Sequence, residues 1–552
     1  MKLQFYALNA ILILIIKTSW SQYKDETDRY FEISKNMEIY NQVIKELNND
    51  YIKNIDPNRM LNVGLNAMLE DLDPYTVFYS ESDLEDFRLE SQGNIESLGI
   101  SIVNKNKKII ISNIQKESPL VSKNIPIGST ILKINGMSLE GKSEDEINSL
   151  FSSSSTIQLL IRNLNEKEEQ IELKRKVSNF ASLRAAELIG SEENIAYISL
   201  SQFVQSSEAE IRRELERMKK EKDLKGIILD LRGNPGGLLD QAIKVSNLFI
   251  PKNEVVVSVE GKDENQKQVL TTQRDAWNAE LPLVVLINHQ SASASEIVSG
   301  TIQDMDRGVV LGDRSYGKGL VQNIRPLGYN TRLKLTTAYY YTPSGRSIQS
   351  IDYAQKNEDG SVAHIPEERR KTFLTKNGRK VKDGGGIDPD IFIEEEKANP
   401  LIVALKSNYI IFDFATQYYK KNQEKPSIEN FKLSEKDWEA FKTFVMQNEL
   451  ATEILLGKEW KNWKQKFTKE NKDKEINHLL NKFEKDLESL QKSLIEKNKN
   501  AIEFAIGKEI IKRYYFEEGM HKYIFHHPNA SLEKAIELIE KPNLYKNILE
   551  KK

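Results

Sequence analysis

The chain of 552 residues contains no cysteine and only 6 histidines, and its net charge is only −3. Without cysteine it can form no disulfide, use no thiol nucleophile and bind no zinc through sulfur. Its 79 basic residues are nearly balanced by 82 acidic ones, so no excess of positive charge favours nucleic acid as a partner. The length predicts three or four domains.

Long apolar runs are also scarce, and the clearest one lies at the N-terminus. It extends from Ala10 to Ile16 and is followed by Ser19 and Ser21. The run is short for a membrane-spanning helix, and small residues at this distance suit a signal-peptidase site. Residues 1–21 are therefore predicted to be a signal peptide that exports the chain, with a bacterial periplasm as the simplest destination. An uncleaved membrane anchor is the alternative.

Metal and cofactor motifs are also lacking. His526 and His527 are adjacent, so they cannot face the same way on a helix, and neither belongs to an H-E-x-x-H motif. The glycine loop at 233–237 has neither the Walker lysine nor the G-x-G-x-x-G spacing of nucleotide sites. We therefore predict no metal and no cofactor.

The stretch 288–322 carries the candidate chemistry. The apolar run before it, 281–287, predicts a buried strand, and the apolar spacing after it predicts a helix that begins within 291–295. Ser293 is thus predicted to lie at a strand-to-helix turn. Unpaired amides in the first turn of a helix can hold the negative oxygen that forms when a carbonyl is attacked.

A serine hydroxyl also needs a base, and Lys318 is the candidate. Its amine, with an ordinary pKa of about 10.4, has to be shifted to roughly 7–8 by burial before it can accept a proton at neutral pH. The flanking Gly317 and Gly319 allow close passage of the backbone, which would help to bury the amine. Alone, S-A-S-A-S is typical of a helix cap and G-K-G of an exposed loop.

Together these segments resemble the signature of the carboxy-terminal processing peptidases, the tail-specific Ser-Lys proteases of family S41. In that family a serine inside S-A-S-A-S-E precedes the lysine of G-K-G-x-V-Q. The resemblance implies that Ser293 is the nucleophile, Lys318 the general base and Gln322 the residue that orients the lysine. Asp304, eleven residues after Ser293, is a possible supporting group, although a solvated helix carboxylate is the favoured interpretation. His289 as the base would leave the lysine without a task.

A second family hallmark is D-L-R-x-N-x-G-G at 230–237, where a predicted strand meets a glycine loop. The resemblance implies that the backbone amides of Gly237 and Ala294 hold the oxyanion. Glycine suits this task because the scissile carbonyl must approach the main chain closely. Glu296, in the first turn of the predicted helix, is expected to complement the helix dipole.

Residues 91–176 form short predicted strands and turns whose order resembles a PDZ domain. Such a domain binds a peptide C-terminus as an added strand and holds its carboxylate with loop amides. Gly128-Ser129 stands where the family has Gly-Asp, and the serine run 152–155 replaces a glycine pair. These departures affect ligand preference more than fold, and a purely structural β domain is the alternative. The implied carboxylate loop consists of Leu98, Gly99 and Ile100.

The remaining segments complete the predicted domain order. Amphipathic helices are predicted over 22–90, and Lys- and Glu-rich helices without chemistry over 399–552. Between the two, 177–398 alternates strands and helices, which indicates a largely parallel sheet with helices packed on it. Within that core, 352–383 is polar and predicted to be a mobile loop. The whole is a multidomain α+β protein: a crotonase/ClpP-like α/β protease core with an inserted PDZ-like β domain and helical regions at both ends.

We therefore predict an exported serine endopeptidase that recognises substrate C-termini through its PDZ-like domain and cleaves with a Ser-Lys dyad. The expected partners are proteins or peptides with accessible C-termini, an adaptor lipoprotein, and further copies of the chain through the helical regions. One alternative is a non-catalytic PDZ-type peptide-binding scaffold, which would bind tails equally well with Ser293 replaced. The other is a crotonase-like acyl-CoA enzyme, which would bind coenzyme A.

Overall fold

The computed structural model describes residues 28–81, 94–142, 146–147, 150–151, 156–174, 176–179, 182–263, 267–356, 362–394, 399–422, 424–447, 466–467, 474–527 and 529–550. Contacts within the chain divide it into two compact units, Met1–Phe78 and Tyr79–Lys552. The predicted signal peptide, 1–21, and the serine run 152–155 lie outside the described residues. No helix in the described ranges has both the length and the hydropathy needed to cross a membrane.

The described residues of the first unit are mainly helical, as predicted. A helix covers 28–50, and α2 (Pro57–Glu70) follows it. The carboxylate of Asp56 caps α2 by accepting from the amide of Asn58 at 3.0 Å, and a proline occupies the first turn, where no amide donor is needed. Strand β1 (Val77–Tyr79) ends this region. Many large apolar side chains of helix 28–50 are exposed, namely Tyr30, Phe31, Ile33, Met37, Ile39, Tyr40 and Val43.

The PDZ-like region forms an antiparallel sheet with the strand order β3-β4-β5-β7-β8, and β6 pairs with β5. The bounds are β3 (Ile100–Lys105), β4 (Lys108–Ile114), β5 (Thr130–Ile134), β6 (Met137–Ser138), β7 (Thr156–Arg162) and β8 (Glu168–Lys174). Alternate residues such as Leu159 and Ile161 are fully buried, as expected for strands with one face on a core. The short helix α4 (Pro119–Ser122) packs nearby, and β2 (Asn94–Ser97) pairs with β9 (Lys176–Asn179). The predicted strands are confirmed.

The second sheet forms the centre of the following region and has the order β10-β11-β12-β15-β16-β23. Strand β10 is antiparallel to β11 and all other pairs are parallel, which confirms the predicted sheet. The bounds are β10 (Leu183–Ile189), β11 (Ile195–Leu200), β12 (Gly226–Asp230), β15 (Leu283–Ile287), β16 (Val309–Gly312) and β23 (Ile391–Phe392). Because β12, β15 and β16 run the same way, their carboxyl ends meet at one edge, where such sheets place their sites.

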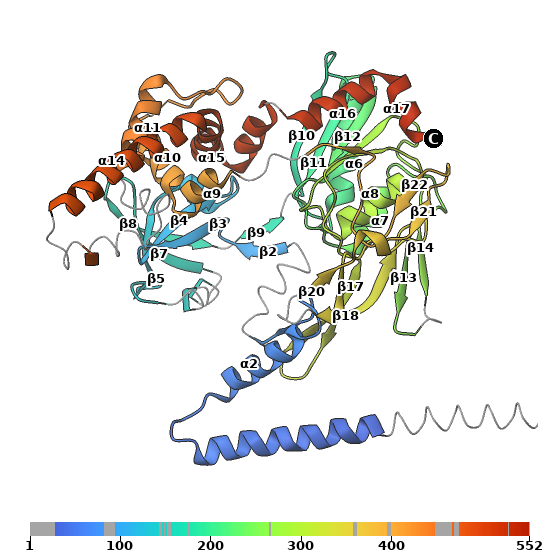
Figure 1. Ribbon diagram of the computed structural model, residues 1–552, viewed down its shortest axis with the longest axis horizontal. Coiled ribbons are helices and arrows are strands. Elements are labelled where there is room, and N and C mark those ends of the chain that lie inside the picture. Colours follow the sequence, from blue (N-terminus) through green and yellow to red (C-terminus); the bar gives the residue numbers. More distant parts are fainter. Residues whose placement is uncertain are drawn as a thin grey trace, which may run out of the picture. The chain divides into compact units, whose positions relative to one another are not determined.

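Helices cover both faces of this sheet (Figure 1). Ile227 and Leu229 point to one face and pack with α6 (Ser207–Glu221), α7 (Leu239–Ser246) and α8 (Ala294–Asp304). Ile228, between them, points to the other face and packs with α16 (Ala530–Glu540) and α17 (Pro542–Leu549). The last two helices of the chain therefore complete the core of this sheet.

A further antiparallel sheet contains β13 (Val255–Gly261), β14 (Gln268–Thr271), β17 (Leu320–Pro326) and β18 (Arg332–Tyr341). Strands β17 and β18 form a long hairpin, and β13 lies on the other side of β18. Because β17 begins at Leu320, it leaves directly from the Gly-Lys-Gly segment.

The prediction of a mobile loop over 352–383 is wrong for its described residues. They form two hairpins and a 3-10 turn instead: β19 (Ile351–Lys356), β20 (Val362–His364), η3 (Glu367–Arg369), β21 (Thr372–Leu374) and β22 (Lys380–Lys382). The buried guanidinium of Arg370 pairs with Asp388 at 2.5 Å and with Glu367 at 2.8 Å. Ionic contacts thus order a segment that lacks the hydrophobic periodicity from which strands are predicted.

The remaining C-terminal helices form a cluster of their own around Trp438, Phe441 and Ile506. They are α9 (Pro400–Ser407), α10 (Ile410–Lys421), α11 (Glu435–Gln447), α14 (Lys474–Lys497) and α15 (Lys499–Phe525). Phe412 of α10 and Phe516 of α15 pack against the core of the PDZ-like sheet. Helical regions were predicted here, and the described helices confirm them.

Candidate active site

Ser293 lies at the sharp turn between β15 and α8, as predicted. It is the residue before the first turn of α8, and its backbone has φ 54° and ψ −112°. A positive φ is unfavourable for any residue with a Cβ, and such strain persists only where neighbours fix the conformation. Ser291 helps to fix the turn, since its hydroxyl donates to the carbonyl of Leu231 at 2.7 Å.

Asn234 joins the glycine loop to this turn. Its carbonyl accepts from the amide of Ala292 at 3.0 Å and from the hydroxyl of Ser295 at 2.9 Å. Its fully buried side chain donates to the carbonyl of Leu200 and accepts from the amide of Gly236. The two loops that the sequence analysis treated separately are therefore one unit, and Asn234 had been noticed only as part of a motif.

The glycine loop passes so close to its neighbours that side chains are excluded. A methyl group on Gly236 would lie 2.7 Å from the carbonyl oxygen of Ala292, and one on Gly237 would lie 2.1 Å from that of Phe203. Both glycines also have a positive φ. Within the described chain neither Gly237 nor Ala294 donates its amide hydrogen to another residue. Both predicted oxyanion donors are thus available to a substrate, and their role stays a prediction.

Glu296 connects the serine turn to the lysine loop. Its fully buried carboxylate accepts four hydrogen bonds. One oxygen accepts from the amide of Ser293 at 2.8 Å and from that of Lys318 at 2.9 Å. The other accepts from the hydroxyl of Ser315 at 2.5 Å and from the amide of Gly317 at 2.7 Å. The two candidate catalytic residues therefore lie next to each other around one carboxylate.

The charge of Glu296 follows from this environment. Burial raises the pKa of Glu296 to about 7, against the four hydrogen bonds, which favour the ionised form. Only the ionised carboxylate can accept all four bonds, because a protonated one carries a hydrogen of its own. Its place in the first turn of α8 predicted only an interaction with the helix dipole, and its contacts with the lysine loop were not predicted.

Lys318 lies in a loop that packs tightly, as its two glycines predicted. A methyl group on Gly317 would lie 2.4 Å from the Cβ of Ser350, and one on Gly319 would lie 2.9 Å from the amide nitrogen of Gln349. The side chain of Lys318 is half-buried. Close approach of the backbone thus brings this lysine partly out of water.

Tyr340 of β18 contacts the same two candidate residues from another direction. Its hydroxyl donates to the main-chain carbonyls of Ser293, at 3.1 Å, and of Lys318. The tyrosine is 1% exposed. In the sequence it is one of three consecutive tyrosines, 339–341, and nothing there indicates these contacts. Gln322 lies on the adjacent strand β17, where its side-chain amide donates to the hydroxyl of Thr336 at 3.3 Å.

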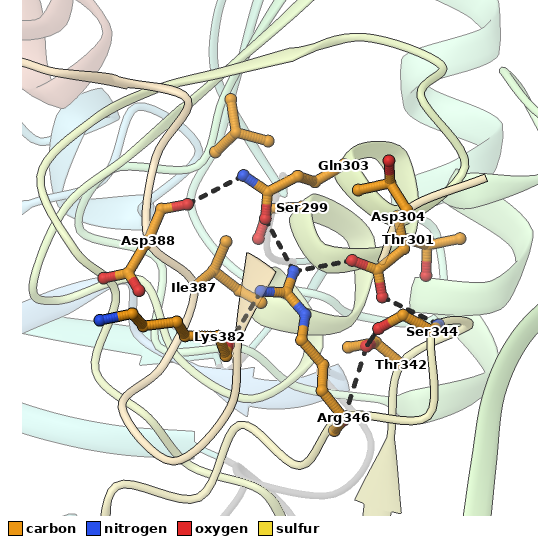
Figure 2. A network of polar contacts seen from close by, with 12 residues as sticks. Ser299, Thr301, Gln303, Asp304, Thr342, Ser344, Arg346, Lys382, Ile387 and Asp388 are labelled. Atoms are coloured by element: carbon orange, nitrogen blue, oxygen red, sulfur yellow. Dashed lines mark hydrogen bonds and ion pairs between the residues drawn. The ribbon is translucent and has the colours of Figure 1, made fainter. Parts of the chain in front are cut away.

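Asp304 is not a solvated helix carboxylate, and that favoured interpretation is wrong. It is 2% exposed and forms an ion pair of 2.8 Å with the fully buried guanidinium of Arg346 (Figure 2). Its second oxygen accepts from the amide of Ser344 at 3.0 Å. Asp304 ends α8, so a rise of 1.5 Å per residue places it about 16 Å from Ser293. Any support that it gives to the site acts through α8.

The network around Arg346 fixes this end of α8. The guanidinium also donates to the side chain of Gln303 at 2.7 Å and to the carbonyl of Lys382 at 3.1 Å (Figure 2). The amide of Gln303 donates in turn to the carbonyl of Asp388 at 2.9 Å. These bonds connect the C-terminal end of α8 to the segment of Arg346 and to the segment 382–388, which are distant from it in sequence.

The alternative base, His289, is exposed in the turn after β15. Within the ranges that the structure describes, no three His, Asp or Glu side chains are grouped so that they could hold a metal ion.

The predicted carboxylate loop of the PDZ-like region has a defined conformation. Gly99 has φ 63°, and its carbonyl accepts from the amide of Gln115 at 2.7 Å. The carbonyl of Leu98 accepts from the hydroxyl of Ser118 at 2.5 Å. Ile100 begins β3, which lies at the edge of its sheet, where a peptide strand can be added. Binding of a carboxylate here stays a prediction.

Comparison with known families matches three segments of the chain. Residues 194–356 match Peptidase family S41, 86–162 match the PDZ domain, and 401–539 match the family described as "Probable PDZ-protease, C-terminal helical domain". A carboxy-terminal-processing protease of Bartonella bacilliformis is 33% identical over 350 residues, which cover 62% of this chain and 78% of that protein. The chain belongs to peptidase family S41. More particularly, it is a serine-type peptidase of the carboxy-terminal-processing group with a PDZ domain.

A second relative and a solved structure also match. A "Probable CtpA-like serine protease" of Staphylococcus haemolyticus is 31% identical over 310 residues, 55% of this chain and 61% of that protein. Among solved structures, the photosystem II D1 C-terminal processing protease is 20% identical, with a TM-score of 0.36 over 64% of this chain and 86% of that one. The predicted family and the multidomain α+β class are confirmed.

Proposed function

We propose that this chain is an exported serine endopeptidase in which Ser293 is the nucleophile and Lys318 the general base. The observation that carries the proposal is the shared carboxylate of Glu296, which accepts from the amides of both residues. A serine at the N-terminus of a buried helix and a half-buried lysine are thereby neighbours in space. The closeness of the two main chains supports a mechanism in which an adjacent base activates the hydroxyl.

The reaction proceeds in two halves. Ser293 Oγ attacks the substrate carbonyl while Lys318 Nζ takes its proton, and the amides of Gly237 and Ala294 stabilise the oxyanion. The protonated lysine then gives its proton to the leaving amine, so the peptide bond breaks and an acyl-serine remains. A water molecule, deprotonated by the same lysine, attacks the ester; the lysine returns this proton to Ser293 Oγ as the acyl–oxygen bond breaks and the new C-terminus is released. Gln322 orients the amine throughout.

The lysine has to be neutral for this chemistry. Lowering its pKa from about 10.4 to roughly 7–8 requires about 4 kcal/mol of differential desolvation. The tight backbone contacts of Gly317 and Gly319 favour burial, and a bound substrate covers the remaining exposed face of the site. Removing one oxyanion donor from such a site typically lowers kcat about 10²- to 10³-fold.

The PDZ domain selects substrates by their C-termini. A peptide tail adds as a strand beside the edge strand β3, with its carboxylate at the amides of Leu98, Gly99 and Ile100. The defined conformation of the loop and the position of β3 at the end of its sheet support this assignment. The substrates are accordingly proteins or peptides whose C-terminal segments are accessible.

Export and assembly complete the proposal. Residues 1–21 direct the chain to the periplasm, where an adaptor lipoprotein can deliver substrates. The exposed apolar side chains of helix 28–50, Phe31 and Met37 among them, support association with a second copy, because large apolar side chains on a monomer surface are unfavourable in water. Sedimentation of the purified chain measures this association.

Cleavage of a folded protein with an unstructured C-terminal tail tests the mechanism. Ser293→Ala and Lys318→Ala each abolish cleavage while the circular dichroism spectrum is retained, and His289→Ala cleaves normally. Turnover by the lysine variant would remove the base assignment, and loss of turnover in the histidine variant would move that role to His289.

The same assay separates the peptidase from a non-catalytic scaffold. A scaffold binds the tail but yields no shortened product by mass spectrometry, and Ser293→Ala leaves its behaviour unchanged. If the chain is a peptidase, the wild type yields the shortened product and the Ser293→Ala variant does not, although both bind the tail with the same affinity.

A further inference from the structure

The main-chain carbonyls of Ser293 and Lys318 are held by one side-chain hydroxyl. Tyr340 donates to both oxygens, at 3.1 Å for Ser293 and at closer range for Lys318. One hydroxyl hydrogen is shared between two acceptors, so the bond requires both carbonyls to point at the same place. The ring is 1% exposed, which keeps water from replacing the hydroxyl.

This contact is the counterpart of the one that Glu296 makes. The carboxylate holds the amide hydrogens of Ser293 and Lys318, and the tyrosine holds the carbonyls of the same two residues. Each candidate catalytic residue is thus fixed on both sides of its Cα atom. Without these bonds the two backbones could move relative to each other, and the distance from the Ser293 hydroxyl to the Lys318 amine would vary.

Both residues need such fixing for reasons of their own. Ser293 has an unfavourable backbone conformation, with φ 54°, that relaxes unless its neighbours hold it. Lys318 stands between two glycines, which add conformational freedom to the unfolded loop. A buried donor that bonds both carbonyls restrains the two at once.

Tyr340 also links the site to the β17–β18 hairpin. Its own amide donates to the carbonyl of Gly319 at 3.0 Å, and Val259 of β13 lies opposite it in the sheet. The tyrosine is thus anchored in a sheet that does not contain Ser293. A shift of that sheet moves the hydroxyl, and with it the carbonyls that it holds.

We propose that Tyr340 is a positioning residue for the Ser293–Lys318 pair, acting through the main-chain carbonyls of both residues. This inference rests on the proposed function, since it concerns the geometry of that same pair. The hydroxyl of Tyr340 bonds main-chain carbonyls, so we expect its effect to appear in kcat rather than in KM. A misplacement of about 1 Å in such a pair can lower the rate about 100-fold.

The test is Tyr340→Phe in the full chain, which removes the hydroxyl and keeps the ring. We expect kcat to fall at least 10-fold with KM within twofold of wild type, measured with a tail-bearing protein at 15 °C. The pH at which kcat reaches half its maximum should also move, because the base meets the serine in a changed geometry. Tyr339→Phe is the matched control: its neighbouring ring is half exposed and should leave kcat unchanged.

Three outcomes are separable. If Ser293→Ala still cleaves, the proposed function fails, whatever Tyr340→Phe does. If Ser293→Ala is inactive and Tyr340→Phe keeps kcat and the pH profile within twofold of wild type, the positioning role is overturned. If Tyr340→Phe is partly unfolded, the kcat per folded molecule, obtained from the folded fraction by circular dichroism, decides in the same way.

Discussion

The amide nitrogens of Ser293 and Lys318 donate to the same oxygen of Glu296, at 2.8 and 2.9 Å. The distance between the two nitrogens therefore cannot exceed the sum of these lengths, although the residues belong to different loops. A single carboxylate thus sets how the serine turn and the lysine loop meet. This relationship makes the site sensitive to the chemistry of one buried acid.

Replacing Glu296 by glutamine should therefore impair catalysis. The glutamine amide is a donor, so it faces two of the four donors that now bond the carboxylate. We expect kcat to fall at least 10-fold. Glu208→Gln, which changes a glutamate in the first turn of α6, is the control and should have no effect on kcat. Equal activity of the two variants would contradict a role of Glu296 in catalysis and leave only its interaction with the dipole of α8.

Ionisation of Glu296 should raise the activity of the enzyme and lower the stability of its fold. Burial raises the pKa of Glu296 from 4.5 to about 7, so the folded chain holds this proton more tightly than the unfolded chain. The contribution of the group to the free energy of unfolding, on the order of 3 kcal/mol, is therefore lost as pH rises through this window. Activity needs the ionised form of Glu296, so kcat should rise over the upper part of the pH range between 4.5 and about 7. Urea unfolding and kcat from pH 5 to 8, compared between wild type and Glu296→Gln, measure both trends.

The buried pair of Arg346 and Asp304 should be a major determinant of stability. Arg346→Met leaves a carboxylate without its cation in a site closed to water, which typically costs about 3–5 kcal/mol. Arg217→Met removes an arginine from exposed ion pairs of α6 and should cost less than about 1 kcal/mol. Urea denaturation gives both values. Similar losses in the two variants would contradict the importance of burial.

Gly237→Ala should abolish turnover while the chain still folds. Its methyl group would lie 2.1 Å from the carbonyl oxygen of Phe203, so the loop must move and take its amide away from the oxyanion. We expect a 10²-fold or greater loss of kcat. Gly136→Ala also has a positive φ but meets no atom within 4 Å, so it measures the backbone strain alone. Full activity of the Gly237 variant would exclude this amide as a donor.

Recognition of C-termini should appear in KM. A methyl group on Gly99 would lie 3.1 Å from the Cβ of Ser118, which disturbs the predicted carboxylate loop. We expect Gly99→Ala to raise KM for a substrate with a free C-terminus and to leave kcat unchanged. Gly141→Ala, with a positive φ and open space around it, is the control. A substrate with an amidated C-terminus should show no difference between wild type and variant.

Much of the fold and of the candidate site could be predicted because their signals are local. The apolar run 281–287 and the spacing after Ser295 identified β15 and α8, and the glycines beside Lys318 indicated its tight loop. Contacts between distant segments carry no such signal. Asp304 looks solvated in the sequence because Arg346, its partner, follows 42 residues later.

Even where a local sequence pattern correctly placed a residue at a helix N-terminus, it did not predict the contacts of the side chain. Ser206 precedes α6 and is a residue type that favours capping, but its side chain makes no capping bond and donates to Glu210 instead. Glu296 fits the pattern of a first-turn acid, yet three of its four donors come from 315–318. Residue type and spacing thus located these side chains without identifying what they bind.

Every residue of α8 is buried, whereas only four of the fifteen residues of α6 are. A helix with no solvent-facing side has nowhere to accommodate a larger or charged replacement. Saturation mutagenesis should therefore find 294–304 intolerant at every position, without the three-to-four-residue rhythm of permissive sites that 207–221 will show. A substitution anywhere along α8 thus disturbs the packing behind Ser293, whereas most positions of α6 can change without such a cost.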